Sequence, residues 1–327
     1  TVEGANILTR TLITFAQGSL RCHPFLLAEI EAAQNEDAAE GLDAFDAAFC
    51  GHVGFVVSNV AGAFFHNLTG GLFAPAPMNG GTIEAHYRQL SRGSRTFALV
   101  ADLTVSLLGG DLKAKQRIAG RLADALSEIY LISSMLKRFE DAGRPREDLD
   151  TLQYCVEHSL VRFDRSIEAV VSNFPIKVLR PIMRLLCFPL GMRRRAPSDA
   201  LAKKIVRQVM EPGAFRDRMT KGVFVSHDPD DVTGVLEVAM EKVIAAEAIE
   251  KKLDKAIRAG TIRRFHGYDW FADAEKAGVL TADEVATLRE MDELVSRVIA
   301  VDHFDPEAVK PNYQSTAPAA SMGLAAE

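Results

Sequence analysis

The first ten residues contain the most distinctive side chains that could take part in chemistry. Glu3 and Gly4 stand directly before the stretch Ala5-Asn6-Ile7-Leu8-Thr9-Arg10. A carboxylate at this position can act as a general base where its surroundings exclude water and raise its pKa. The same pair is common as a turn followed by an acid in the first helical turn, where the helix dipole favours a negative charge. Spacing alone favours this second, structural interpretation.

A basic segment at residues 174–196 is the second feature that could carry a function. Its basic residues are Lys177, Arg180, Arg184, Arg193, Arg194 and Arg195. On a helical projection the first three share one face, and a separate apolar face is formed by Leu179, Met183, Leu186 and Leu190. A basic amphipathic helix of this kind can lie in the headgroup region of an anionic membrane. It can equally be a solvated basic face that packs its apolar side on a helical bundle, and both interpretations stay open.

The charge balance argues against nucleic acid as a partner. The formal net charge is −6, yet residues 175–210 carry nine basic residues and one acid, Asp199. The local excess is contrary to the global balance, which makes a localised partner site plausible. No aromatic side chains alternate with the arginines, as single-stranded nucleic-acid sites require.

Three cysteine–histidine pairs resemble fragments of a zinc motif: Cys22-His23, Cys50-x-His52 and Cys155-x-x-His158. A structural zinc site needs four converging ligands, usually including a Cys-x-x-Cys pair, and the sequence has none. We therefore predict no metal, and capping or core roles for these residues. The wide spacing of the four cysteines predicts buried, reduced thiols in a cytoplasmic protein. Gly70-Gly71 and Gly80-Gly81 are predicted to be turn residues rather than a phosphate loop.

The apolar periodicity predicts an all-α fold. Spacings of three and four recur in four stripes: Leu122 to Leu136, Leu152 to Val170, Val232 to Ala246, and Val285 to Val298. Asp141-Ala-Gly-Arg-Pro145 should end one long helix. Thr281 and Glu284 form a capping-box pattern. Longer helices are expected near 5–32, 36–68, 90–108, 112–141 and 147–172.

Glycines and prolines in residues 69–81 indicate a boundary in this helical array. We predict a first helical unit at 1–82, a helical extension at 83–310 and a disordered tail at 311–327. The apolar run Val53–Phe65 is shorter than the roughly 20 residues of a membrane span, so it predicts a buried core helix. The chain opens without an initiator Met or a signal peptide, which we interpret as a piece of a longer protein.

The stretch Glu3–Arg10 resembles the Glu-Gly-Thr-Asn/Ser-x-Ile-x-Arg signature of acyl-CoA dehydrogenases. The longer run Glu3–Pro24 is similar to the long bacterial enzymes of fatty-acid β-oxidation, which carry an additional helical domain after the dehydrogenase C-terminal domain. The similarity continues to Arg297–Phe304. Ala5 stands where many members have Thr, so no side-chain contact with flavin is expected there.

The resemblance implies α,β-desaturation of a fatty acyl-CoA by an FAD-dependent enzyme. Glu3 would remove the α-proton while the β-hydrogen leaves as hydride to the flavin, and Gly4 and Asn6 would lie beside the flavin. Electrons would pass to an electron-transfer flavoprotein. Family members commonly form homo-oligomers through this helical domain.

The resemblance also implies that further domains precede Thr1, so this chain alone should be inactive. Related very-long-chain enzymes use a helical extension at a membrane. This favours a cytoplasmic protein that contacts the inner face of the cytoplasmic membrane through residues 174–196. The alternative is a non-catalytic helical module that docks its parent enzyme on a membrane or a partner protein.

Overall fold

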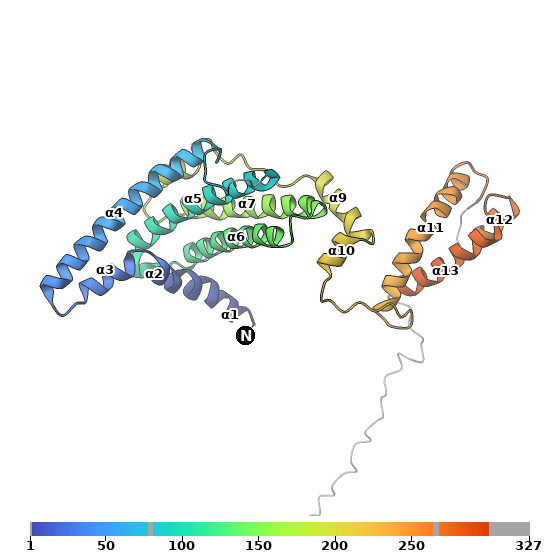
Figure 1. The fold of residues 1–327 in the computed structure, drawn as a ribbon, viewed down its shortest axis with the longest axis horizontal. Coiled ribbons are helices and arrows are strands. Elements are labelled where there is room, and N and C mark those ends of the chain that lie inside the picture. Colours follow the sequence, from blue (N-terminus) through green and yellow to red (C-terminus); the bar gives the residue numbers. More distant parts are fainter. Residues whose placement is uncertain (1, 78–80, 264–267, 301–327) are drawn as a thin grey trace, which may run out of the picture. The chain divides into compact units, whose positions relative to one another are not determined.

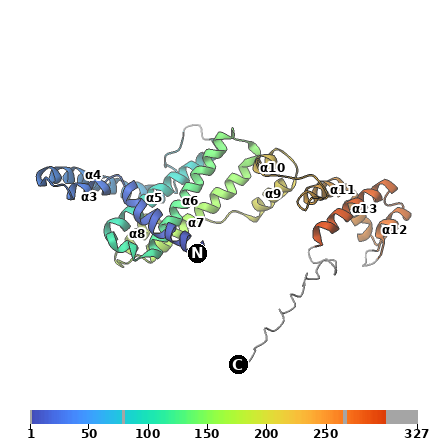
Figure 2. The ribbon, with the colours of Figure 1, turned by 90° about the horizontal axis from the view of Figure 1, so that it is seen from below.

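Three long helices lie side by side at the centre of the first part of the chain (Figures 1 and 2). They are α5 (Glu84–Leu108), α6 (Gln116–Asp141) and α7 (Leu149–Ser172). This computed structural model describes residues 2–77, 81–263 and 268–300, and these residues form helices and turns without a strand. The all-α prediction is confirmed. The chain divides into two compact units, Thr1–Arg216 and Asp217–Glu327.

The apolar stripes predicted on α6 and α7 form the core of the first unit. Leu122, Ile132 and Leu136 of α6 are completely buried, and so are Val156 and Ile167 of α7. Burying one such side chain stabilises the fold by roughly 1.5–3 kcal/mol. The regular recurrence of these residues is therefore sufficient to hold the helices together.

The chain turns between α6 and α7 at the predicted place. Helix α6 ends at Asp141, and Gly143 and Arg144 follow with φ values of 79° and 58°. A positive φ is easy for glycine but strained for arginine. Arg144 Nε donates to Glu140 Oε2 at 2.6 Å, which stabilises the reversal. The short helices η2 (Gly81–Ile83), η3 (Gly109–Lys113) and η4 (Arg146–Asp148) occupy the connections.

The N-terminal helical region is divided where the sequence predicted one helix. Its parts are α1 (Val2–Leu8), the π-helical η1 (Thr9–Gln17), α2 (Gly18–Cys22) and α3 (Leu26–Ala33). His23 is extended, with ψ 134°, because the following Pro24 disfavours helical backbone at the residue before it. The expected helix 5–32 therefore breaks after Cys22.

Helix α4 (Ala38–Leu68) forms a hairpin with α3 that extends beyond the three central helices (Figure 1). The prediction of a buried core helix at Val53–Phe65 is wrong. Val53, Val57 and Phe65 are 47%, 62% and 48% exposed. Within the described residues, α3, α5 and α8 (Leu179–Cys187) are the main helices that pack on α4, and they leave one apolar face uncovered. By length and composition alone, α4 could cross a membrane.

The second unit contains a pair of long helices, α11 (Gly234–Arg258) and α13 (Ala282–Ile299), with α12 (Trp270–Lys276) packed on α13. The predicted capping box is present: Thr281 accepts from Glu284 N, and Glu284 accepts from Thr281 N. The apolar stripe predicted on α13 is buried from Val285 to Met291.

The stripe predicted from Val232 to Ala246 is only partly buried. Its members Ala239 and Ala246 are buried, whereas Leu236 is 51% exposed and Val232, which precedes α11, is 86% exposed. The buried face of α11 also carries Val235 and Leu253.

The boundary predicted at residue 82 falls within the first compact unit, where α4 and α5 pack on each other. The tail predicted at 311–327 lies outside the described residues. All four cysteines are free, as expected. Their predicted burial holds for Cys187 alone: Cys22 and Cys50 are exposed and Cys155 is half-buried. Burial raises the pKa of the Cys187 thiol to about 12, with a further contribution from Asp164.

Candidate functional site

Glu3 lies in the first turn of α1, with its side chain exposed. Gly4 and Asn6 are exposed as well, and a Cβ built on Gly4 would meet nothing within 4 Å. Within the described part of the chain Glu3 has no ion pair or side-chain hydrogen bond. The structure thus places the three predicted residues together on one short helix but encloses none of them.

The helix that carries Glu3 is anchored to the central bundle at two points. Arg10 Nε donates to Asp124 Oδ1 at 2.5 Å, and the second carboxylate oxygen accepts from Arg10 Nη2. Five residues later, Phe15 is buried and contacts Phe97 of α5 edge-on, at a centroid distance of 6.3 Å. Gly120 lies directly below the Arg10 guanidinium, since a Cβ there would be 2.8 Å from Nη1. Sequence reasoning missed this clamp because 114 residues separate its partners.

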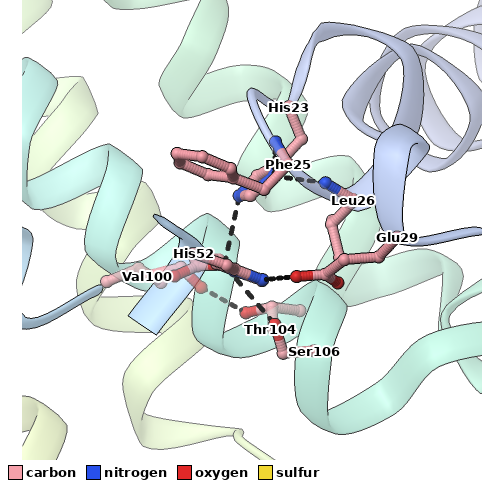
Figure 3. Close-up of polar contacts among 9 residues, drawn as sticks. His23, Phe25, Leu26, Glu29, His52, Val100, Thr104 and Ser106 are labelled. Carbon is pink, nitrogen blue, oxygen red and sulfur yellow. Dashed lines mark hydrogen bonds and ion pairs between the residues drawn. The ribbon is translucent and has the colours of Figure 1, made fainter. Parts of the chain in front are cut away.

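A buried group of two imidazoles and two carboxylates joins α3, α4 and α5 near His23 (Figure 3). The His52 ring lies between Glu29 Oε1, 2.7 Å from Nδ1, and Asp102 Oδ1, 2.9 Å from Nε2. His23 Nε2 lies 3.3 Å from the same Asp102 oxygen. We call these four residues the His52 cluster. Their side chains are between 3% and 14% exposed, so little water reaches them.

Hydrogen bonds fix the protonation of both rings in the His52 cluster. His23 Nδ1 accepts from the backbone N–H groups of Phe25 and Leu26, so the ring proton must be on Nε2, facing Asp102. Both nitrogens of His52 face carboxylates, an arrangement that suits the doubly protonated ring.

The pKa values of the two rings shift in opposite directions. Burial lowers the pKa of His52, but hydrogen bonds to Asp102 and Glu29 outweigh it, and the net shift is upward. Burial lowers the pKa of His23, and the positive His52 also lowers it, against the opposing effect of Asp102. The surroundings therefore favour the charged form of His52 and the neutral form of His23.

The His52 cluster contains the residue types of a metal site, but its hydrogen bonds place a proton on a nitrogen whose lone pair a metal would need. Potential ligand atoms of His23, His52 and Asp102 lie within 4.8 Å of one another. A metal needs the lone pair of His23 Nε2, yet that nitrogen carries the proton because Nδ1 accepts two N–H groups. The geometry therefore favours a network of ion pairs and hydrogen bonds that stabilises the fold. The predicted capping role of His23 is confirmed at the start of α3.

The basic segment is helical over only part of its length. Helix α8 covers Leu179–Cys187, and residues 188–198 are irregular. Pro181 is tolerated in the first turn, where backbone N–H groups lack helical partners, but Pro189 cannot continue the helix and Gly191 follows with φ 76°. The predicted helical face through Leu190 is therefore wrong beyond α8. Met183 alone of its four members is buried.

The six basic residues of this segment have different surroundings. Arg180 donates to Phe174 O at 2.7 Å, Arg184 pairs with Glu168 at 3.1 Å, and Arg194 pairs with Asp164 at 2.8 Å. Arg193 donates to Leu190 O. Lys177 and Arg195 are exposed. Some of these basic residues thus contact the bundle, and others lie on the exposed surface.

A second apolar row of α8 faces solvent. Val178, Ile182 and Leu185 recur at spacings of four and three and are 76%, 50% and 58% exposed. Met183 and Cys187 on the other side of the helix are buried. Helix α8 therefore packs on the bundle and also presents an apolar row between arginines.

The all-helical fold and a comparison with known families together define the class of protein. Residues 20–304 match the family described as acyl-CoA dehydrogenase, C-terminal, bacterial type. The chain belongs to this family. No solved structure matches the chain.

Proposed function

We propose that this chain is the C-terminal part of an FAD-dependent acyl-CoA dehydrogenase that desaturates fatty acyl-CoA thioesters in β-oxidation, with Glu3 as its base. The observation that carries the proposal is the position of Glu3. Glu3 lies in α1, which η1 and α2 continue into the family-matched region, and the Arg10–Asp124 clamp in η1 holds this helical run on the bundle. An electron-transfer flavoprotein is the proposed electron acceptor.

The residues present do not form a flavin cradle by themselves. Glu3, Gly4 and Asn6 are exposed, and among the described residues nothing beyond the surrounding helix would lie within 4 Å of a Cβ at Gly4. A carboxylate needs burial to become basic enough for a thioester α-proton. In the proposed enzyme, domains outside residues 1–327 supply that enclosure together with most of the acyl-CoA site. The chain alone should show no activity.

The test is desaturation of palmitoyl-CoA by the full-length parent with an artificial electron acceptor. Glu3→Gln should lower kcat by about 10²–10⁴-fold, because an amide cannot accept the α-proton. Glu31→Gln, at an exposed position of α3, is the matched control and should keep full activity. Flavin absorbance must be equal in both variants. Activity retained in Glu3→Gln with flavin bound would place the base elsewhere.

We propose membrane docking as a second function, which the exposed apolar row of α8 favours. Val178, Ile182 and Leu185 can enter the headgroup region while Lys177 and Arg195 meet anionic phosphates. The enzyme would then be a cytoplasmic protein bound peripherally to the inner face of the cytoplasmic membrane.

Vesicle flotation with phosphatidylglycerol tests the docking surface. Lys177→Glu with Arg195→Glu should weaken binding strongly, since each basic residue near such a surface contributes about 1 kcal/mol. Lys113→Glu with Lys251→Glu makes the same change of charge at exposed positions outside the segment and should weaken binding much less. Equal losses in the two double variants would mean that net charge alone drives binding.

We further propose that the parent enzyme is a homo-oligomer in which the uncovered apolar face of α4 meets a second copy. Leu42, Phe49, Val53 and Val57 are 61%, 50%, 47% and 62% exposed along this helix. Contiguous exposed apolar surface of this extent is typical of interaction sites.

A further inference from the structure

A pocket of about 330 Å³ lies between the end of α4, the first half of α5, α7 and the irregular chain after α8. Its walls include the three arginines Arg92, Arg193 and Arg194, with Asp164 as the carboxylate among the lining residues. All of these residues belong to the first compact unit. The pocket therefore carries a surplus of about two positive charges.

Arg92 is the unusual member of this group. It is half-buried, and within the described residues no carboxylate lies within ion-pair distance of it. Its Nε donates to Asn67 Oδ1 at 2.8 Å and its Nη1 to Gln89 Oε1 at 3.3 Å. A guanidinium has five N–H donors, so these two bonds leave three unused. Burial lowers the pKa of Arg92, and neighbouring Arg194 lowers it further, against the opposing effect of Asp164.

Arg194 faces the same pocket from the other side. Its Nε donates to Asp164 Oδ2 at 2.8 Å and its Nη2 to Gln89 Oε1 at 3.2 Å. Gln89 thus accepts from both guanidinium groups and donates through Nε2 to Gly70 O at 2.8 Å. This single amide holds the two like charges next to each other. A pair of half-buried guanidinium groups is costly unless an anion lies between them.

The ligand chemistry follows from charge and geometry. Guanidinium groups bind carboxylates and phosphates through paired N–H donors. A carboxylate would neutralise only half of the surplus charge, whereas a phosphate monoester carries a charge close to −2 at neutral pH. We propose that this pocket binds a phosphate monoester, carried either by a soluble phosphorylated compound or by the monoester headgroup of a phospholipid, with Arg92 and Arg194 as its paired ligands.

This site differs from the docking surface proposed for α8. Arg194 points into the pocket and is 18% exposed, whereas the docking surface uses the outward Lys177 and Arg195. The phosphate site also requires neither Glu3 nor flavin. Its failure would leave the proposed dehydrogenase function unchanged.

Calorimetric titration of the 327-residue chain with inorganic phosphate tests the proposal, with chloride and acetate at equal ionic strength as reference anions. Phosphate should bind saturably and more tightly than either. Arg92→Gln and Arg194→Gln should each weaken binding about tenfold, the value of one charge-assisted hydrogen bond. Arg95→Gln is the matched control, because Arg95 lies one turn further along α5 and donates to Ser58 O outside the pocket. It should bind phosphate as the unaltered chain does.

Asp164→Asn is a variant that should gain affinity for phosphate, a result that unfolding cannot produce. The amide keeps an oxygen acceptor for Arg194 and removes the carboxylate that competes with the anion, so phosphate should bind several-fold more tightly. Two results would overturn the proposal: equal binding of acetate and phosphate, or equal phosphate binding by Arg92→Gln and Arg95→Gln.

The source of the phosphate is decided with vesicles that contain phosphatidic acid, a phospholipid whose headgroup is a phosphate monoester. If a lipid headgroup is the ligand, Arg92→Gln lowers vesicle binding and free phosphate competes with the vesicles. If the ligand is soluble, Arg92→Gln loses phosphate binding while its vesicle binding is unchanged. Either result supports a phosphate site.

Discussion

His52 Nε2 lies 2.9 Å from Asp102 Oδ1, and Nδ1 of the same ring lies 2.7 Å from Glu29 Oε1. One ring thus connects three helices, since Glu29 belongs to α3, His52 to α4 and Asp102 to α5. Phe25 stacks on the ring at an interplanar angle of 12°, which helps to exclude water. The His52 cluster is therefore a buried polar connection between the α3–α4 hairpin and the bundle.

His52→Gln should destabilise the first unit by about 2–4 kcal/mol. The amide cannot satisfy both carboxylates in the ring's geometry, and a buried charge without its partner is costly. Urea unfolding followed by far-UV circular dichroism measures the loss. The one tryptophan, Trp270, belongs to α12 in the second unit, so its fluorescence should report an unchanged transition there. His158→Gln, at an exposed position of α7, is the control and should change stability by less than about 0.5 kcal/mol.

The stabilisation of the fold by the His52 cluster should depend on pH, and the parts due to His52 and His23 should change in opposite directions. The folded pKa of His52 is raised above 6.5, so its stabilisation is complete below 6.5 and is lost as pH rises through the folded pKa. The folded pKa of His23 is lowered, so its contribution is complete above 6.5 and is lost as pH falls through that pKa. The cluster should stabilise the fold most near pH 6.5.

Unfolding free energies at about pH 6.5 and about pH 8.5 test the His52 part of this prediction. The difference between the unaltered chain and His52→Gln should shrink at the higher pH. A constant difference would show that folding does not raise the pKa of His52.

The sequence predicted the helical core well because that core depends on local periodicity. Leu122 to Leu136 and Leu152 to Val170 occupy one face of each helix, and the structure buries both faces. The ends of helices could also be predicted, because the capping box at Thr281 and the chain reversal at Gly143 depend on neighbouring residues only. The exposure of Leu236 on α11 was not predicted, because packing against the rest of the fold, and not local periodicity, decides which face of a helix is covered.

Long-range polar contacts could not be predicted from one sequence. Arg10 and Asp124 have no local signature, and neither do His52 and Asp102. The exposure of α4 was missed because an apolar composition indicates burial without saying whether this chain or another surface provides it. The Glu3 hypothesis rests on a resemblance of neighbouring residues, because a lone exposed carboxylate at a helix start has no other local signature of a base.

The Arg10–Asp124 clamp should show non-additive energetics with Gly120. Asp124→Asn should cost about 0.5–1 kcal/mol, the value of a well-aligned but partly exposed pair. Gly120→Ala places a Cβ 2.8 Å from Arg10 Nη1 and should displace the guanidinium from Asp124. The double variant should therefore lose less stability than the two single losses combined. Additive losses would indicate that Arg10 moves aside without losing its partner.

Thr281→Ala should destabilise the second unit by about 1 kcal/mol, because it removes the acceptor for Glu284 N at the start of α13. Glu284 also pairs with Lys252 of α11, so the loosened turn should weaken the contact between the two helices. Trp270 fluorescence during urea unfolding measures the effect. Thr287→Ala, which removes an exposed hydroxyl within α13, is the control and should have little effect.

The proposed contact between copies through α4 predicts a change of oligomeric state. Val57→Asp places a charge on the apolar face at a position that is 62% exposed within one chain. Burying an unpaired carboxylate in an interface costs several kcal/mol, so the full-length enzyme should dissociate at concentrations where the unaltered enzyme is associated. Light scattering after size exclusion gives the masses directly. Val232→Asp, at a position that is 86% exposed in the second unit, makes the same change away from α4. Equal masses for both variants would mean that copies do not meet through this face.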